Sequence, residues 1–229
     1  MNLLCGVIGV IFALEGKPGI AFPLMLAAAL CDFLDGMAAR ALNAYSDLGK
    51  ELDSLADVVS FGVLPALMMY ATMRTCTYSN AVWCYIPLLI AVFSGVRLAK
   101  FNLDERQHEN FLGLATPASA MLCGSLCYYI AAEPASILNV WAGGFVFLPL
   151  VAVALCALLV SEVPMFSLKM KKSDPAVLRR KRLYFAINVV LVVAIVALLG
   201  LNWSLAVLLS LVVYVLMNLV FFVTLSRSE

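Results

Sequence analysis

The chain has 229 residues, of which 64% are apolar and only 13% are charged, and its mean hydropathy is +1.02. A soluble domain is typically about 45–50% apolar and about 25% charged, so this composition excludes an ordinary soluble protein. The formal net charge of +1 also excludes a strongly basic domain that would bind nucleic acid. The length suits one domain, which we expect to be a bundle of helices in lipid.

Eight apolar segments follow one another along the chain. Most approach or exceed the ~17–25 residues that a helix needs to cross a bilayer. Backbone polar groups in lipid must find partners within the protein, so helix is the expected structure. The segments are 1–14, 19–44, 56–73, 81–98, 116–132, 138–160, 183–199 and 203–225. They predict one all-α integral-membrane domain, 1–229, with eight spans or with seven spans and an interfacial first segment.

Positive charge is distributed unevenly between the two sides of this predicted bundle. If the N-terminus lies in the cytoplasm and the spans alternate, every Lys and Arg except Lys17 and Arg74 falls on the cytoplasmic side. This asymmetry obeys the positive-inside rule. The basic stretch 169–182 should then attract anionic lipid headgroups, at about 1 kcal/mol per basic residue. The uncharged last two segments, within 183–225, are expected to make packing or dimer contacts and to carry no chemistry.

Two pairs of aspartates interrupt the apolar pattern between residues 32 and 57. Asp32 and Asp35 are three residues apart near the inner end of the second segment, so they share a helix face. Asp53 and Asp57 are four residues apart at the start of the third helix and share a face as well. The polar stretch 41–52 is the expected connection that folds the third helix back beside the second. The two pairs are therefore predicted to face each other at the inner rim.

Carboxylates gathered at the edge of a bilayer need counter-charge, since one charge at the bilayer centre already costs at least about 2.5–3.5 kcal/mol. Two divalent cations would neutralise four carboxylates, and oxygen ligands suit Mg²⁺ or Mn²⁺. Two metals can hold both the attacking and the leaving oxygen of a phosphoryl transfer. Two other interpretations stay open, namely carboxylates that cap helix ends and carboxylates that line a cation or proton pathway.

The spacing of this stretch, D-x2-D-G-x2-A-R-x8-G-x3-D-x3-D, resembles the signature of the CDP-alcohol phosphatidyltransferase family. The chain supplies it with Asp32, Asp35, Gly36, Ala39, Arg40, Gly49, Asp53 and Asp57. Enzymes of that family replace the CMP of a CDP-linked lipid with an alcohol. The resemblance implies a six-helix catalytic core, here 1–170, followed by two additional helices in 183–225, and a homodimer. We expect a prokaryotic cytoplasmic membrane, with the site facing the cytoplasm.

The resemblance also implies a role for each position of the signature. The implied metal ligands are Asp32, Asp35, Asp53 and Asp57. Asp57 would also act as general base on the incoming hydroxyl, because a protonated alcohol is a poor nucleophile. The residues implied to bind CDP are Gly36, Ala39, Arg40 and Gly49. The three small residues would leave room for the nucleotide, and the arginine would lie near its phosphates.

Further stretches resemble the branch of this family that joins CDP-diacylglycerol to L-serine, the phosphatidylserine synthases. They are DSLADVVSFGVLPA at 53–66, SGVRLAKFN at 94–102, FLGLATPASA at 111–120 and LLVSEVPMFSLK at 158–169. Ala115 departs from that branch, where proline is often found. The chain also begins almost at its first span, without the amphipathic lead-in common in the family, and this leaves an incomplete or alternative start open.

An acceptor with a carboxylate would need a cation, and Arg97 and Lys100 share a face at the inner end of the fourth helix. An arginine can bind a carboxylate with two parallel hydrogen bonds. Both residues could instead be anchors that extend to lipid headgroups. Further acceptor candidates are Ser60, Asn102 and Thr116. Two alternatives remain: a sister enzyme that uses glycerol phosphate or an inositol phosphate, which would need a denser cationic pocket, and a cation transporter.

Overall fold

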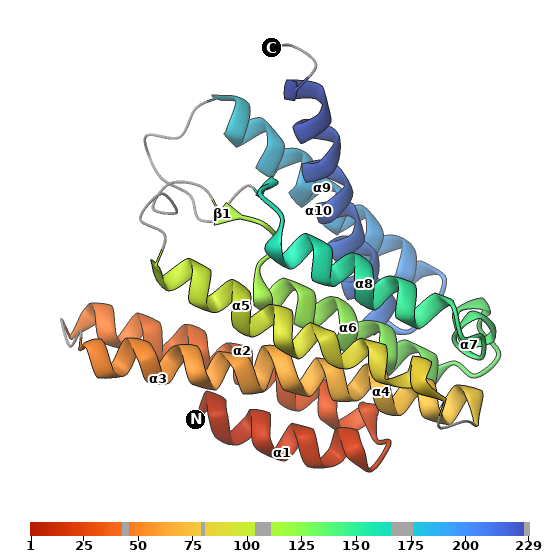
Figure 1. Cartoon of the computed structure of the whole chain (residues 1–229). Coiled ribbons are helices and arrows are strands. Elements are labelled where there is room, and N and C mark those ends of the chain that lie inside the picture. The colour runs from red at the N-terminus through yellow and green to blue at the C-terminus, as the bar shows by residue number, and fades with distance from the viewer. Residues whose placement is uncertain (43–45, 79–80, 104–110, 166–175, 227–229) are drawn as a thin grey trace.

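The computed structural model describes residues 1–42, 46–78, 81–103, 111–165 and 176–226, most of which are helical (Figure 1). Within these ranges, five helices are long and apolar enough to cross a membrane. Their spans are Pro18–Ala39, Leu48–Thr77, Val82–Leu103, Arg179–Leu198 and Trp203–Phe222. Shorter apolar helices accompany them at Asn2–Leu14 and Phe147–Val160. The prediction of an all-α polytopic membrane protein is confirmed.

Each of the eight predicted apolar segments contains helix. The first half of the chain forms α1 (Asn2–Leu14), α2 (Pro18–Ala41), α3 (Asp47–Asp57), η1 (Val58–Val63), α4 (Leu64–Thr77), η2 (Val82–Leu88) and α5 (Leu89–Leu103). The second half forms β1 (Phe111–Leu112), α6 (Thr116–Ala132), α7 (Ile137–Ala142), α8 (Phe147–Val160), β2 (Pro164–Met165), α9 (Ala176–Leu198) and α10 (Trp203–Ser226). Most of the basic stretch predicted at 169–182 lies outside the described residues or at the start of α9.

The third helix begins earlier than predicted. The sequence predicts a polar connection at 41–52, but α3 starts at Asp47 because Ser46 caps it. The Oγ of Ser46 accepts a hydrogen bond from the amide of Gly49 at 3.0 Å, which satisfies one of the free amides at the helix start. The chain then stays helical through α3, η1 and α4, so both Asp53 and Asp57 lie inside one long helix.

A π-helical turn, η1, interrupts this long helix directly after Asp57. At its end the amide of Leu64 donates to the carbonyl of Val59, five residues back. The next residue, Pro65, has no amide hydrogen for the regular α-helical pattern, which favours a local change of this kind. Such turns are frequent at functional sites.

The sixth predicted segment, 138–160, is two helices and not one. Helix α7 ends where the amide of Gly143 donates to the carbonyl of Asn139 at 3.0 Å, and α8 begins four residues later. Gly143 and Gly144 each cost a helix about 1 kcal/mol relative to alanine, so a continuous helix is disfavoured here.

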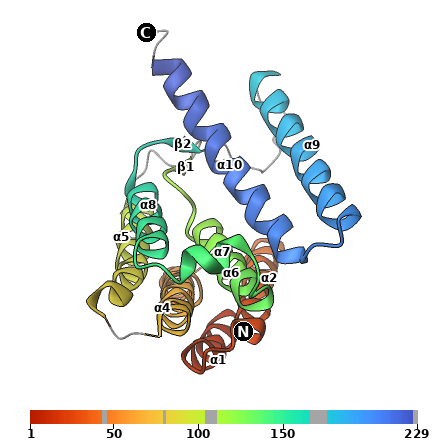
Figure 2. The same ribbon diagram turned by 90° about the vertical axis from the view of Figure 1, so that its right-hand side faces the viewer.

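Helix α6 lies at the centre of the bundle, packed against α2 and α4 on one side and α10 on the other. Helix α1 packs on α2, η1 and α4, and a side chain at Gly6 would collide with Ser60. Small residues at such crossings let helix backbones approach closely. Figure 2 shows α9 outermost, beside α10. In Figure 1 the end of α2, the start of α3 and the end of α5 lie at one end of the bundle, opposite α7.

A short antiparallel strand pair, β1 with β2, ties the entry of α6 to the exit of α8, with Phe111 opposite Met165. The amide of Gly113 donates to the carbonyl of Val163 at 2.9 Å, which extends the pairing. Gly113 has a φ of 73°, and a Cβ there would lie 2.7 Å from the carbonyl oxygen of Ser161. This tight approach explains a glycine at the position.

We expect Gly113→Ala to lower the melting temperature of the purified protein in detergent. A non-glycine residue in this backbone region costs about 1–3 kcal/mol, and the new methyl group would also press against backbone oxygens that cannot yield freely. The control is Gly95→Ala in α5, where a Cβ meets nothing within 4 Å and alanine is the better helix former. An unchanged melting temperature for Gly113→Ala would contradict the strained geometry.

Candidate active site

Four aspartates from two neighbouring helices meet at one end of the bundle. Helix α2 supplies Asp32 and Asp35, and α3 supplies Asp53 and Asp57. One carboxylate oxygen from each of Asp32, Asp35 and Asp53 lies within 4.8 Å of the other two. The half-buried Asp57 interacts electrostatically with all three. The structure therefore brings the two predicted pairs together, with three carboxylates in range to share one ion.

This cluster has no cationic partner among the residues that the structure describes. Between described residues the only ion pair joins Lys17 to Glu15, in the turn between α1 and α2. Close carboxylates repel one another, so the arrangement favours a bound cation. The donor atoms are all carboxylate oxygens, and hard divalent cations such as Mg²⁺ and Mn²⁺ prefer these ligands. The residues therefore fit a divalent metal.

Asn2 is a site residue that sequence reasoning missed. Its Nδ2 donates a hydrogen bond to Oδ1 of Asp57 at 3.0 Å, and its side chain is only 3% exposed. The hydroxyl of Ser60 donates to the main-chain carbonyl of Asn2 at 3.2 Å, which fixes the start of α1 beside η1. The available signal was a polar residue at the start of an apolar segment. Asn2 therefore restrains the orientation of the Asp57 carboxylate.

We expect Asn2→Ala to lower kcat at least about tenfold and to leave substrate KM values little changed, since a hydrogen bond to a charged group contributes about 1.5–3 kcal/mol. Steady-state kinetics with the purified protein measure both constants. The matched control is Asn188→Ala in α9, because the Nδ2 of Asn188 reaches only the carbonyl of Tyr184 in its own helix. Equal losses in both variants, or no loss in Asn2→Ala, would contradict this role.

Small residues border the aspartates on both helices. Gly36 is exposed and Ala39 half-buried on α2, just beyond Asp35. On α3 a side chain at Gly49 would lie 2.9 Å from the Oγ of Ser46, so the helix cap itself also favours glycine there. The surface beside the cluster is therefore free of bulky side chains at these positions. The side chain of Arg40 lies outside the described residues.

Arg97 lies deeper in the bundle, between α5 and α6. Its side chain is only 7% exposed, and Nη1 donates to Oγ1 of the fully buried Thr116 at 3.2 Å. The Nε atom is buried without a hydrogen-bond partner, and no carboxylate in the described chain pairs with this guanidinium. A buried, unpaired charge is costly, so this arrangement favours an anionic ligand.

The remaining acceptor candidates differ in their surroundings. Lys100 is exposed one turn beyond Arg97. Asn102 is half-buried, and its Nδ2 donates to the hydroxyl of Ser54 on α3 at 2.9 Å. The Ser60 hydroxyl is occupied by the main chain of α1, as described above. Of these residues, the structure places only Arg97 and Thr116 in contact with each other.

Comparison with known proteins agrees with this chemistry. Residues 1–158 match the family described as CDP-alcohol phosphatidyltransferase. This region contains all four aspartates, Arg97 and Thr116.

Several curated relatives share the match. The CDP-diacylglycerol–serine O-phosphatidyltransferase of Mycobacterium tuberculosis is 38% identical over 172 residues, which cover 72% of this chain and 58% of that protein. The enzyme of the same name from Bacillus subtilis is 35% identical over 120 residues, covering 52% of this chain and 67% of the relative. The archaetidylserine synthase of Methanothermobacter thermautotrophicus is 35% identical over 127 residues, which cover 55% of this chain and 53% of that protein. The chain thus spans less than two thirds of the mycobacterial relative.

Proposed function

The chain belongs to the CDP-alcohol phosphatidyltransferase family, and on this premise we propose that it transfers a phosphatidyl group from CDP-diacylglycerol to the hydroxyl of L-serine. The products would be phosphatidylserine and CMP. The observation that carries the proposal is the convergence of Asp32, Asp35 and Asp53 from two helices, with Asp57 beside them. The names of the relatives support serine as the acceptor.

Two divalent cations, Mg²⁺ or Mn²⁺, would be held by these carboxylates. Asp32, Asp35 and Asp53 would hold the first, and Asp57 would contribute to the second. When bound, the cations would neutralise the donor pyrophosphate and stabilise the charge that develops on the transferred phosphoryl group. The dependence of this family on metal ions and the oxygen-only donor set both support this assignment.

Asp57 would act as the general base. The serine hydroxyl gives its proton to the Asp57 carboxylate as its oxygen attacks the lipid-side phosphorus. The bond between that phosphorus and the bridging oxygen breaks, and CMP leaves with the electron pair. The hydrogen bond from Asn2 is made to one Asp57 oxygen, so the lone pairs of the other oxygen remain for the cation and for the proton.

The CDP group would lie along the small residues of α2 and α3. Gly36, Ala39 and Gly49 would allow its close approach, and Arg40 would lie near the phosphates. The donor's diacylglycerol part would remain among the membrane lipids, beside the apolar helices. We place this site on the cytoplasmic face of the membrane, because the basic residues of the sequence favour that side.

The serine carboxylate would bind Arg97. This guanidinium is buried, has an unpartnered Nε and lies beside the Thr116 hydroxyl. A carboxylate could accept two parallel hydrogen bonds from it. Lys100 is exposed and would act at most from a distance. A single buried cation suits a carboxylate better than the phosphate of glycerol phosphate or inositol phosphate.

An acceptor panel tests the proposal. Purified protein receives CDP-diacylglycerol with L-serine, glycerol 3-phosphate or inositol phosphate in turn, and CMP release is measured with and without EDTA. Among the three acceptors, we expect only L-serine to give CMP release, with phosphatidylserine as the lipid product. EDTA should abolish this release, and added Mg²⁺ or Mn²⁺ should restore it. Metal-dependent release with a phosphorylated acceptor and none with serine would refute the serine assignment. Release that survives EDTA would refute the metal mechanism.

A further inference from the structure

Polar groups around Arg97 outnumber the partners that the protein gives them. Ser94 lies one turn deeper than Arg97 on α5, and Ser119 lies one turn deeper than Thr116 on α6. Both serine hydroxyls are fully buried and, like the Nε of Arg97, have no hydrogen-bond partner in the described chain. Buried polar atoms are nearly always satisfied, so this region is built to receive a polar ligand or water.

Helix α10 brings a further polar side chain to this region. The ring of Trp203, at the start of α10, lies 5.1 Å from the ring of Tyr128 near the end of α6. Helix α10 crosses α6 and also contacts β2, whose partner β1 lies just before the start of α6 at Thr116. Tyr214 lies about three turns beyond Trp203 along α10, and so toward the β1–β2 pair. Its side chain is 9% exposed, and its phenol group interacts electrostatically with Arg97 and through a hydrogen bond with Asn218.

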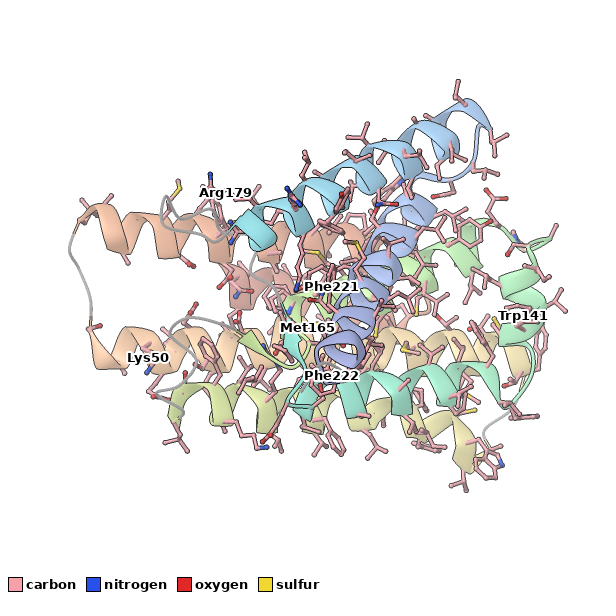
Figure 3. The ribbon with its side chains drawn as sticks, turned by 90° about the horizontal axis from the view of Figure 1, so that it is seen from above. Lys50, Trp141, Met165, Arg179, Phe221 and Phe222 are labelled. Carbon is pink, nitrogen blue, oxygen red and sulfur yellow. The ribbon has the colours of Figure 1, made fainter. Side chains whose placement is uncertain are left out.

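The position of Tyr214 is fixed from two sides. The ring of Phe185 on α9 meets the Tyr214 ring edge-on, with the centroids 5.6 Å apart. One turn further along α10, the Nδ2 of the buried Asn218 donates to the main-chain carbonyl of Tyr214 at 2.8 Å. Figure 3 shows Phe221 and Phe222 of α10 near Met165 of β2, and α10 contacts both β2 and α6. Helix α10 is therefore packed against the core.

The chemistry of a tyrosine suits this place. A phenolic oxygen is a dipole without charge, so it can orient a guanidinium without neutralising it. A carboxylate in the same place would form an ion pair with Arg97 and compete with an incoming anion. A tyrosine near Arg97 thus leaves the positive charge available to a ligand.

We propose that Tyr214 is a positioning residue for the acceptor, whose hydroxyl keeps the Arg97 guanidinium oriented toward the acceptor carboxylate. This inference rests on the proposed function. Tyr214 lies outside residues 1–158, which match the family, and outside the 1–170 core expected from the sequence. The C-terminal pair α9 and α10 then takes part in acceptor selection, where the sequence predicted only packing or dimer contacts.

The test is Tyr214→Phe, which removes the hydroxyl and keeps the ring. We expect the KM for L-serine to rise about five- to tenfold, in line with the loss of one buried hydrogen-bonding group, with kcat and the donor KM within about twofold of wild type. Tyr184→Phe is the matched control, since Tyr184 is exposed on α9. An unchanged serine KM, or an equal fall in kcat, would overturn the proposal.

A second substrate separates positioning from a general structural effect. Serinol has the hydroxyl and ammonium groups of serine but no carboxylate. We expect the preference of Tyr214→Phe for serine over serinol, as a ratio of kcat/KM values, to fall by about the same five- to tenfold. An unchanged ratio with a raised serine KM would assign Tyr214 a packing role only, and would overturn the proposal.

A second variant tests the proposal in case Tyr214→Phe folds poorly. Phe185→Leu loosens the contact that holds the tyrosine ring and keeps its hydroxyl, so we expect a smaller rise of the serine KM in the same direction. No rise in a folded Phe185→Leu protein would count against the proposal. The wild-type protein reports separately on the proposed function: if it releases no CMP with serine, that function fails, whereas the Tyr214 proposal fails only on a wild-type protein that uses serine.

Discussion

Asp57→Asn is expected to lower kcat about 10³-fold while binding of CDP-diacylglycerol is largely kept, because general-base catalysis typically contributes about 10²–10⁴-fold. The amide cannot accept the proton of the serine hydroxyl. It can still accept the hydrogen bond from Asn2, so the local geometry should hold. Asp32, Asp35 and Asp53 remain to hold a metal for the donor. Single-turnover CMP release and donor-binding titrations measure the two effects separately.

Glu51→Gln is the matched control for this variant. Glu51 is an exposed carboxylate on the same helix, α3, and the same change of acid to amide should leave kcat close to wild type. A variant of Asp57 that loses donor binding alone, with normal turnover at saturation, would show that the residue binds the donor and is not the base.

Arg97→Leu is expected to raise the KM for L-serine at least about 100-fold, because hydrogen bonds to charged groups contribute about 1.5–3 kcal/mol each and two such bonds are lost. The donor KM should stay near wild type, since Arg97 lies on α5, hydrogen-bonds to Thr116 of α6 and is not among the residues proposed to bind the donor. The serine KM of Arg97→Lys should lie between those of wild type and Arg97→Leu, because lysine keeps the positive charge but lacks the planar guanidinium that binds a carboxylate with two hydrogen bonds.

Arg74→Leu serves as the control for that change. Arg74 is exposed near the end of α4, where its Nη1 reaches the hydroxyl of Tyr70, so loss of its charge should not affect serine. If Arg97→Leu left the serine KM unchanged, the carboxylate of serine would have to bind elsewhere, and Lys100 would be the next residue to substitute.

The helices could be predicted from composition, because a chain in lipid has little choice of secondary structure. Their interruptions could not. The cap at Ser46 moved the start of the third helix to Asp47, and hydropathy does not register a single side-chain hydrogen bond. The break between α7 and α8 at Gly143 falls inside an apolar run whose average hydropathy hides it.

The acidic site was predictable because helical spacing fixes which aspartates share a face, and one short connection forces the two faces together. Spacing alone could not separate Arg97 from Lys100, since both lie on one face; burial separates them in the structure. Asn2 and Tyr214 lie 55 and 117 residues along the chain from the residues that they serve, Asp57 and Arg97. Such partners follow from tertiary packing, which no local pattern encodes.

Counting the Mn²⁺ ions that the purified protein binds tests the central claim most directly. The loss of the free Mn²⁺ signal in electron paramagnetic resonance gives the number bound per chain, with CDP-diacylglycerol present. The aspartate cluster predicts saturable binding of two ions, which Asp32→Asn or Asp53→Asn reduces and Glu51→Gln does not. A protein that turns over CDP-diacylglycerol and yet binds no Mn²⁺ or Mg²⁺, or binds it equally without these aspartates, would contradict the account.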